Sequence, residues 1–266
     1  MESSRIRLPA VAGTFYPGSV AELQKMIETY LAEATPPQLT GVRAIIAPHA
    51  GYIYSGPTAA FSYKLLKNQT TKPTRILLMG PAHRVWFRGV ALADYTAFET
   101  PMGEIAVDSE TIQKLLEDND IFQPLSQAHS NEHSLEVQLP FLQKIYDAIP
   151  IVPMLFGDVD PTAVAETLNS YLEPDDIVVV SSDLSHYHSY AEAQNLDRDL
   201  IDALLRGDQI GVARGEACGQ APIVTLMTIA QQHNWHPHLL DYRNSGDTAG
   251  DRQHVVGYTA VAYTED

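Results

Sequence analysis

The stretch R-A-I-I-A-P-H-A-G-Y-I-Y-S-G, residues 43–56, decides how the chain is expected to fold. The apolar run at 42–47 has the length and the isoleucines of a buried strand, and Pro48 ends its hydrogen-bond ladder. His49 therefore follows the carboxyl end of a strand and enters a loop that contains Gly51.

The same arrangement occurs twice more in the chain. Residues 76–79, I-L-L-M, precede His83, and residues 177–180, I-V-V-V, precede a polar loop that carries Asp183 and His186. In open α/β sheets, ligands bind beyond the carboxyl ends of parallel strands, so loops far apart in sequence can meet at one site. Because imidazole is the commonest metal ligand in proteins and titrates near neutral pH, the three histidines predict a metal or acid–base site.

Each of these histidines also has a purely structural interpretation. A histidine after a strand can be a loop residue that bonds to backbone, and His83 beside Arg84 could be solvated. Asp183 could cap a short helix and leave His186 in water. The repetition of one context three times favours function for the set.

Length and composition favour one soluble domain. A chain of 266 residues can bury a full core, and it contains no repeat, low-complexity segment or clear linker, so one domain over residues 1–266 is predicted. Aspartate and glutamate number 33 against 17 lysines and arginines, for a net charge of −16, and the cations form no stripe. Nucleic acid is therefore not an expected partner.

The chain is expected to reside in the cytoplasm. Its single cysteine, Cys218, excludes an internal disulfide and agrees with a reducing compartment. Residues 1–9 lack the apolar core of a signal peptide, and no apolar run approaches the roughly 20 residues that cross a bilayer.

Periodicity, caps and breakers predict the remaining elements and an α/β fold with a central, mostly parallel sheet flanked by helices. Helices are predicted at 20–33, 57–68, 109–117, 135–146 (kinked or restarted at Pro140), 162–172, 190–205 and 223–231. Further strands are predicted at 149–156, where prolines favour an edge or a bulge, and at 238–242 and 255–263. A hairpin of residues 89–94 and 104–108 is predicted around the turn 100–103.

Other polar residues are placed where they could join a site. Glu132, His133 and Glu136 lie near the start of a predicted helix, where the acids either complement the helix dipole or orient a histidine. Asp247 follows a predicted strand, and two histidines with one carboxylate are the ligands of non-haem Fe(II) oxygenases and of some zinc hydrolases. Cys218 precedes a predicted helix and is either activated there or buried and inert.

Seven segments together resemble one known family. They are R-L-P-A-V-A-G-T-F-Y-P (7–17), P-H-A-G-Y-I-Y-S-G (48–56), G-P-A-H (80–83), E-H-S-L-E-V-Q-L-P-F (132–141), S-S-D-L-S-H-Y (181–187), A-C-G-Q-A-P-I (217–223) and S-G-D (245–247) with V-V-G-Y (255–258). Several are weak alone, but their order and number resemble the Memo family. This resemblance implies the LigB-like α/β architecture of class III extradiol dioxygenases, with a metal-capable pocket at the strand ends.

The resemblance also implies roles for individual residues. His49 and His83 match the two ligand histidines of the family, and His186 matches its third pocket histidine, which resembles the acid–base residue of the related dioxygenases. Eukaryotic Memo proteins place a cysteine near the last loop, where Asp247 is the candidate replacement in this chain. The related dioxygenases use a glutamate as this ligand, so the aspartate could restore a facial triad.

Partners are implied by the resemblance alone. Bacterial and archaeal members resemble components of the AmmeMemoRadiSam set, beside a radical SAM protein and an AMMECR-type protein. Eukaryotic relatives are described as adaptors that bind phosphotyrosine peptides, with Phe15 and Tyr54 near the corresponding aromatic positions. An unknown small molecule or peptide is therefore the expected ligand.

Three functions compete on this evidence. The first is a non-haem iron protein of the extradiol dioxygenase type, in which His49, His83 and Asp247 hold Fe(II). In this interpretation His186, oriented by Asp183, transfers protons. His186 is also a further candidate ligand, and zinc or copper are alternative metals. The second is a peptide- or protein-binding module without catalysis, and the third is a zinc-dependent hydrolase. The residues expected to line the pocket are Phe15, Tyr54, His133, Glu136 and Cys218.

Overall fold

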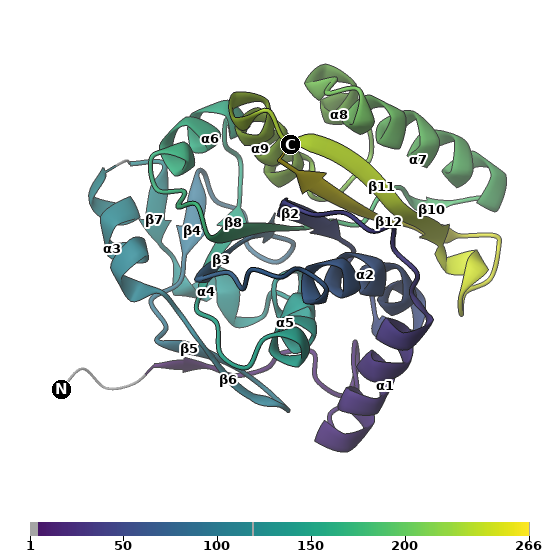
Figure 1. Ribbon diagram of the computed structural model, residues 1–266, viewed down its shortest axis with the longest axis horizontal. Helices are drawn as coiled ribbons and strands as arrows, with labels where there is room; N and C mark the ends of the chain where they lie inside the picture. Colours follow the sequence, from purple (N-terminus) through teal and green to yellow (C-terminus); the bar gives the residue numbers. More distant parts are fainter. Residues whose placement is uncertain (1–4, 119, 266) are drawn as a thin grey trace.

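A large mixed sheet runs through the computed structural model, which describes residues 5–118 and 120–265 (Figure 1). Its strand order is β10-β12-β2-β9-β3-β8-β4-β7, and β11 also pairs with β12. The strands are β2 (Val42–Ala47), β3 (Arg75–Pro81), β4 (Val90–Leu92), β7 (Phe122–Pro124), β8 (Ile151–Phe156), β9 (Asp176–Ser181), β10 (His186–His188), β11 (His236–Asn244) and β12 (Val255–Thr264). The four central strands β2, β9, β3 and β8 are parallel, whereas β12 and β4 on either side are antiparallel to their central neighbours.

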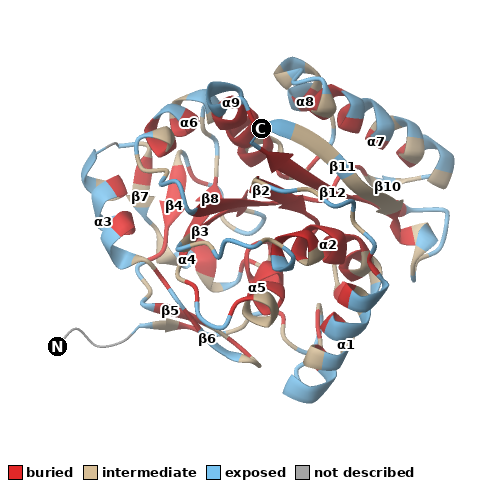
Figure 2. Cartoon of the chain, viewed as in Figure 1, coloured by how far each residue is buried: buried red, intermediate tan, exposed pale blue. Residues whose placement is uncertain are grey.

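Helices cover both faces of this sheet (Figure 1). One face carries α1 (Val20–Glu33), α2 (Tyr52–Lys67) and α5 (Leu139–Ile145), and the other carries α6 (Pro161–Asn169), α7 (Tyr190–Leu205), α8 (Gln209–Arg214) and α9 (Gln220–His233). Strands covered on both faces are expected to be continuously apolar, and every residue of β8 and β9 is indeed buried. Figure 2 shows the buried residues concentrated along the sheet and on the helix sides that face it. The predicted α/β class is confirmed.

A smaller sheet and several short elements complete the described chain. They are β1 (Ile6–Arg7), β5 (Ala97–Thr100), β6 (Gly103–Ala106), α3 (Ser109–Asp118), α4 (Ser126–Ser130) and the 3-10 turns η1 (Glu136–Gln138) and η2 (Ser245–Asp247). The small sheet has the order β1-β5-β6. No helix among the described residues is both long and apolar enough to span a membrane. Residues 1–4, 119 and 266, which belong to the predicted domain, lie outside the described part.

Three predicted elements differ from the structure. The hairpin has the predicted turn, but its first arm is β5, whereas the run at 89–94 supplies β4 of the large sheet. Helix α2 begins at Tyr52 rather than at Pro57, so Pro57 lies inside the helix, where it lacks the N–H for one intrahelical bond. Strand β8 is interior rather than at an edge. It tolerates Pro153 because β4 pairs only with the residues from Met154 onward.

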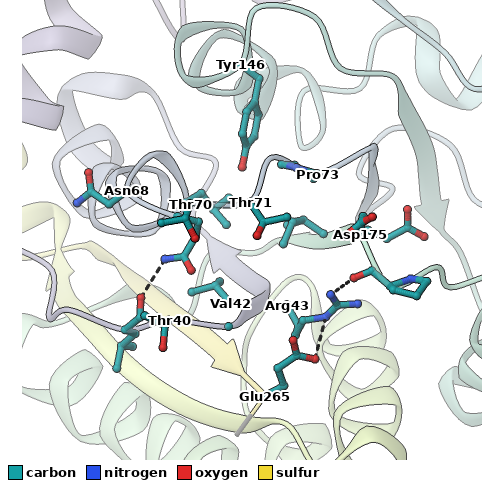
Figure 3. Close-up of a pocket in the computed structure, with 17 residues that line it drawn as sticks. Thr40, Val42, Arg43, Asn68, Thr70, Thr71, Pro73, Tyr146, Asp175 and Glu265 are labelled. Carbon is teal, nitrogen blue, oxygen red and sulfur yellow. Dashed lines mark hydrogen bonds and ion pairs between the residues drawn. The ribbon is translucent and has the colours of Figure 1, made fainter.

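The parallel arrangement determines where the site can form. Strands β2, β3 and β9 run in one direction and therefore end at the same edge of the sheet. The segments that follow them carry His49, His83 and Asp183. At the opposite edge, where these strands begin, a separate cavity of about 350 Å³ is lined by residues such as Arg43 and Tyr146 (Figure 3).

Candidate metal centre

Three imidazole rings meet at the carboxyl edge of the sheet. His49 follows β2, His83 follows β3, and His133 lies between α4 and η1. Each offers one ring nitrogen, and these nitrogens all lie within 4.8 Å of one another. The ring centroids of His83 and His133 are 4.7 Å apart, and that of His49 is 5.2 Å from His83 and 5.4 Å from His133. Such a group can hold one metal ion.

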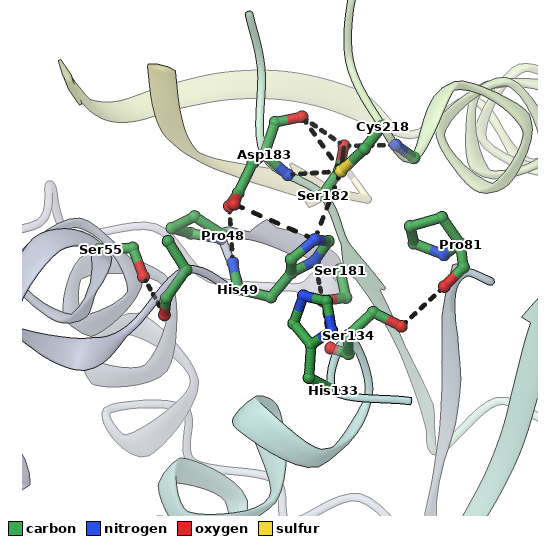
Figure 4. A network of polar contacts seen from close by, with 12 residues as sticks. Pro48, His49, Ser55, Pro81, His133, Ser134, Ser181, Ser182, Asp183 and Cys218 are labelled. Atoms are coloured by element: carbon green, nitrogen blue, oxygen red, sulfur yellow. Dashed lines mark hydrogen bonds and ion pairs between the residues drawn. The ribbon is translucent and has the colours of Figure 1, made fainter. Parts of the chain in front are cut away.

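A chain of hydrogen bonds determines which nitrogen of His49 is free (Figure 4). The Ser181 hydroxyl has one hydrogen and donates it to the carbonyl of Ser134 at 2.6 Å. Ser181 Oγ must therefore accept from its other neighbours, which are Gln138 Nε2 at 2.8 Å and His49 Nδ1 at 2.8 Å. Nδ1 of His49 thus carries the proton, and the lone pair of Nε2 is available to a metal.

His49 is also kept neutral by its surroundings. Burial lowers the pKa of its imidazole to about 4, although the charge of Asp183 works in the opposite direction. A neutral imidazole is the form that binds metals. The site is therefore ready to bind a cation at neutral pH without releasing a proton from His49.

Glu132 orients the other two histidines. Its Oε1 lies 2.9 Å from Nδ1 of His83 and 3.1 Å from Nδ1 of His133, the second contact lacking the alignment of a hydrogen bond. The same carboxylate accepts the backbone N–H groups of His83 at 2.5 Å and of Ser134 at 3.0 Å. Burial would raise the pKa of Glu132, but its contacts with His133 and His83 hold it well below its usual range. The ionised carboxylate accepts from Nδ1 of His83 and so leaves Nε2 of that ring for a ligand, while its charge also lies close to the ring of His133.

A cavity of about 720 Å³ opens beside the cluster. Its lining includes the three histidines, the predicted residues Phe15, Tyr54, Asp183 and His186, and also Arg84, Tyr187, His254 and Tyr258. Its walls are therefore partly aromatic and partly basic.

The structure does not bring Asp247 to the cluster. Its Oδ1 accepts the hydroxyl of Tyr190, and its Oδ2 accepts the N–H of Asn244 at 3.0 Å within the capping box of η2. The carboxylate satisfies its own loop instead of facing His49 and His83. His186, on β10, lines the cavity but is not one of the three clustered histidines. The third member of the group is His133, which the sequence had placed only in the pocket lining.

Asp183 contacts a different histidine from the one expected. Its Oδ1 accepts the backbone N–H of His49 at 2.7 Å, and its Oδ2 lies 4.0 Å from Nε2 of His49 (Figure 4). In the described chain, no hydrogen bond joins Asp183 to His186. Asp183 therefore positions His49, and the expectation that it orients His186 is not met.

The side chain of Cys218 lies beside His49 and is a protonated thiol. Its Sγ is 3.3 Å from Nε2 of His49, and burial raises its pKa to about 12. It lines a neighbouring cavity of about 530 Å³, together with His83 and Arg84, rather than the cavity beside the cluster. The inert, buried interpretation fits this environment better than the reactive one.

Glu136 does not line the cavity but fastens the amino-terminal arm. It is fully buried, pairs with the guanidinium of Arg7 and accepts the N–H groups of Ala10 at 2.8 Å and Val11 at 2.9 Å. The arm it holds carries Phe15, whose ring centroid is 4.8 Å from that of His133. Glu136 thus acts on the site through the arm.

Replacing Ser181 with alanine tests the hydrogen-bond chain. Without the hydroxyl, Nδ1–H of His49 loses its acceptor and the ring loses its fixed tautomer. Loss of a residue that hydrogen-bonds a metal-binding histidine typically lowers metal affinity by about 10- to 100-fold. We expect competition titration with Zn²⁺ to show such a loss for Ser181→Ala, whereas Ser55→Ala, whose hydroxyl donates to the Ala50 carbonyl and not to a histidine of the cluster, should be unchanged. Equal affinities in the two variants would contradict the assigned tautomer.

Comparison with known proteins gives matches over almost the whole chain. The model of a family described as Memo-like protein matches residues 7–262. A MEMO1 family protein of Aeropyrum pernix is 38% identical, and one of Sulfurisphaera tokodaii is 34% identical, each over 97% of this chain and 99% of its own length. Among solved structures, uncharacterized protein JW3007 from Escherichia coli K12 matches with a TM-score of 0.52 at 13% identity, over 82% of this chain and 99% of its own, a likeness of fold alone.

Proposed function

Because the chain belongs to the Memo-like protein family, we propose that it is a metal-dependent oxidoreductase that holds ferrous iron on His49, His83 and His133. Its substrate is a small aromatic molecule of the catechol type, which occupies the adjoining cavity. The observation that carries the proposal is the cluster of three imidazoles at the wall of an aromatic cavity.

The donor set fits a divalent transition metal. Nδ1 of His49 bonds Ser181 and Nδ1 of His83 bonds Glu132, which leaves the Nε2 atoms of these two rings toward a ligand. Nε2 of His49 also lies 3.3 Å from Cys218 Sγ, and Nδ1 of His133 lies 3.1 Å from Glu132 without a hydrogen bond. Imidazole nitrogen suits iron, zinc, copper and nickel alike. A metal held by these three residues would supply Lewis-acid chemistry and a template for the substrate.

Other residues of the cavity have separate roles in substrate binding and in proton transfer. The rings of Phe15, Tyr54 and Tyr258 form apolar surface that suits a planar substrate and excludes water. His186 on the same wall is the candidate general acid–base group, a role worth about 10²- to 10⁴-fold in rate. Asp197, which is 1% exposed, lies close enough to His186 for the two to interact electrostatically. It also accepts the N–H of Ser185, the residue before His186, at 2.9 Å.

A zinc hydrolase is the second candidate, and one observation favours it. Three histidines without a carboxylate are the ligand set that holds catalytic zinc in carbonic anhydrase. With zinc bound, the same three residues would support the hydrolysis of an ester or amide. Copper is a third metal compatible with the donor set.

Metal reconstitution followed by two assays separates these candidates. The metal-free chain is loaded anaerobically with Fe(II) or with Zn(II), and oxygen uptake with catechol and hydrolysis of 4-nitrophenyl acetate are measured. We expect oxygen uptake only with iron, and a loss of about 10²- to 10⁴-fold in His186→Ala with the metal retained. His233→Ala is the matched control, because His233 ends α9, contacts Asn169 through Nε2 and does not line the cavity.

Three outcomes would redirect the proposal. Ester hydrolysis by the zinc form, without oxygen uptake by the iron form, would favour the hydrolase. Neither activity, together with binding of a peptide or protein partner, would favour a non-catalytic binding module. Interaction with AMMECR-type and radical SAM proteins in the cytoplasm stays a proposal that pull-down with purified components can test.

A further inference from the structure

Tyr187 has a backbone conformation that tyrosine rarely adopts. Its φ angle is +63°, in the left-handed region that disfavours side chains with a Cβ. The other non-glycine residue with positive φ in the described chain is Asn234, which ends α9 as a left-handed cap, a common role for asparagine. Tyr187 lies within β10 rather than at a helix end.

A β-bulge produces this conformation. In the pairing of β10 with β12, His186 lies opposite Val256 and His188 lies opposite Val255, so Tyr187 is the extra residue between two consecutive partners. Bulges near functional sites often redirect a side chain. This one directs Tyr187 out of the strand.

Contacts on both sides hold the bulge in place. On the carboxyl-terminal side of the bulge, His188 Nε2 lies 2.6 Å from Oε2 of Glu216. On the amino-terminal side of the bulge, the N–H of Ser185 donates to the Asp197 carboxylate at 2.9 Å, and the N–H of Gly257 donates to the Ser185 carbonyl at 2.9 Å. A Cβ atom at position 257 would collide with the Asp197 carboxylate, so glycine there permits this close packing.

The ring of Tyr187 contacts the ring of His186, with centroids 5.9 Å apart, and is otherwise largely exposed. It is 73% exposed, and in the described part of the chain its hydroxyl has no hydrogen-bond partner. It nevertheless lines the same cavity as Phe15, Tyr54 and Tyr258. A strained backbone that exposes most of a large aromatic ring lowers stability, and the contact with the His186 ring offsets little of that cost. The exposed ring is therefore suited to a contact that it makes when the cavity is filled.

We propose that Tyr187 is a specificity residue whose ring stacks on the planar ring of an aromatic substrate at the mouth of the cavity. This inference rests on the proposed function for its substrate class. The bulge fixes the position of the ring before binding, so little conformational freedom is lost when the substrate stacks on it. Substrates with the same hydroxyl groups but no flat face would gain nothing from Tyr187.

The test compares two diols by titration calorimetry under anaerobic conditions. Catechol is planar, whereas trans-cyclohexane-1,2-diol has similar hydroxyl groups on a puckered ring. We expect Tyr187→Gly to weaken catechol binding by the Fe(II)-loaded chain roughly 3- to 10-fold, in line with the strength of aromatic pairs, and to leave the cyclohexanediol unaffected. Tyr187→Phe should bind catechol like the original chain, since the hydroxyl has no assigned role.

Two further measurements separate strain from a purely structural role. Glycine accepts positive φ, so Tyr187→Gly should melt at the same temperature as the original chain or higher, and it should bind Fe(II) equally well. Asn234→Gly is the control, because it makes the same kind of change at a positive-φ residue that does not line the cavity. The catechol affinity of this variant should equal that of the original chain.

The outcomes distinguish this proposal from the proposed function. Catechol binding of unchanged strength in Tyr187→Gly, or an equal loss for both diols, would overturn the role of Tyr187 and leave the metal centre intact. If the original chain binds no iron, the proposed function fails. In that case catechol binding is compared between the metal-free original chain and metal-free Tyr187→Gly. Equal affinities of the two would overturn the role of Tyr187.

Discussion

Replacement of His133 with alanine is expected to weaken metal binding by more than 100-fold, as much as replacement of His49 or His83. The three rings supply one nitrogen each, within 4.8 Å of one another, so each variant leaves two donors of three. Residues that merely orient a ligand are worth about 10- to 100-fold, and the loss of a ligand itself should exceed that. Competition titrations with Fe(II) and Zn(II) measure the effect.

Asp247→Ala and His186→Ala are the informative controls for this prediction. Both residues could be ligands from their place in the sequence, but the Asp247 carboxylate caps η2 and His186 stands apart from the cluster. We expect both variants to keep the original affinity. A large loss in Asp247→Ala with little change in His133→Ala would restore the carboxylate-containing site and refute the three-histidine site.

Replacement of Glu136 with glutamine is expected to lower the free energy of unfolding by about 3–5 kcal/mol, the usual cost of breaking a buried ion pair. Glu136 and Arg7 are 0% and 2% exposed, and the carboxylate also accepts a hydrogen bond from the Tyr16 hydroxyl at 2.6 Å. Glutamine keeps the shape but leaves the Arg7 charge buried without its counter-ion. Urea unfolding followed by circular dichroism measures the loss.

Two variants show whether the buried charge is responsible. Tyr16→Phe removes one hydrogen bond to Glu136 and keeps the ion pair, so it should cost less, about 1.5–3 kcal/mol. Glu110→Gln makes the same chemical change in the exposed pair with Lys114 and should have little effect, because water screens that pair. If Glu136→Gln were no more harmful than Glu110→Gln, the arm would not be held by this ion pair.

The parts of the fold predicted well from sequence are those determined by local pattern. Apolar runs that end at a proline or glycine located β2 and β3, and one-sided helical periodicity gave α1 the same bounds as in the structure. Since parallel strands end at one edge, the meeting of His49 and His83 followed from the fold class alone.

The parts predicted poorly depend on contacts between distant segments. His133 follows no strand, and it reaches the cluster because Glu132 beside it bonds His83, 49 residues earlier in the chain. Strand β10 has only three residues and a bulge, too little for any periodicity to show. The sequence N-S-G-D predicts a loop that presents a ligand, whereas in the structure its asparagine and aspartate cap each other.

An anomalous-scattering map from a crystal grown anaerobically with Fe(II), recorded on both sides of the iron edge, tests the three-histidine centre most directly. The structure predicts one peak at about 2.0–2.1 Å from a ring nitrogen of each of His49, His83 and His133, typical of metal–imidazole bonds. A peak coordinated by Asp247 or His186 without His133 would contradict it, as would an iron-soaked crystal with no peak among the three rings.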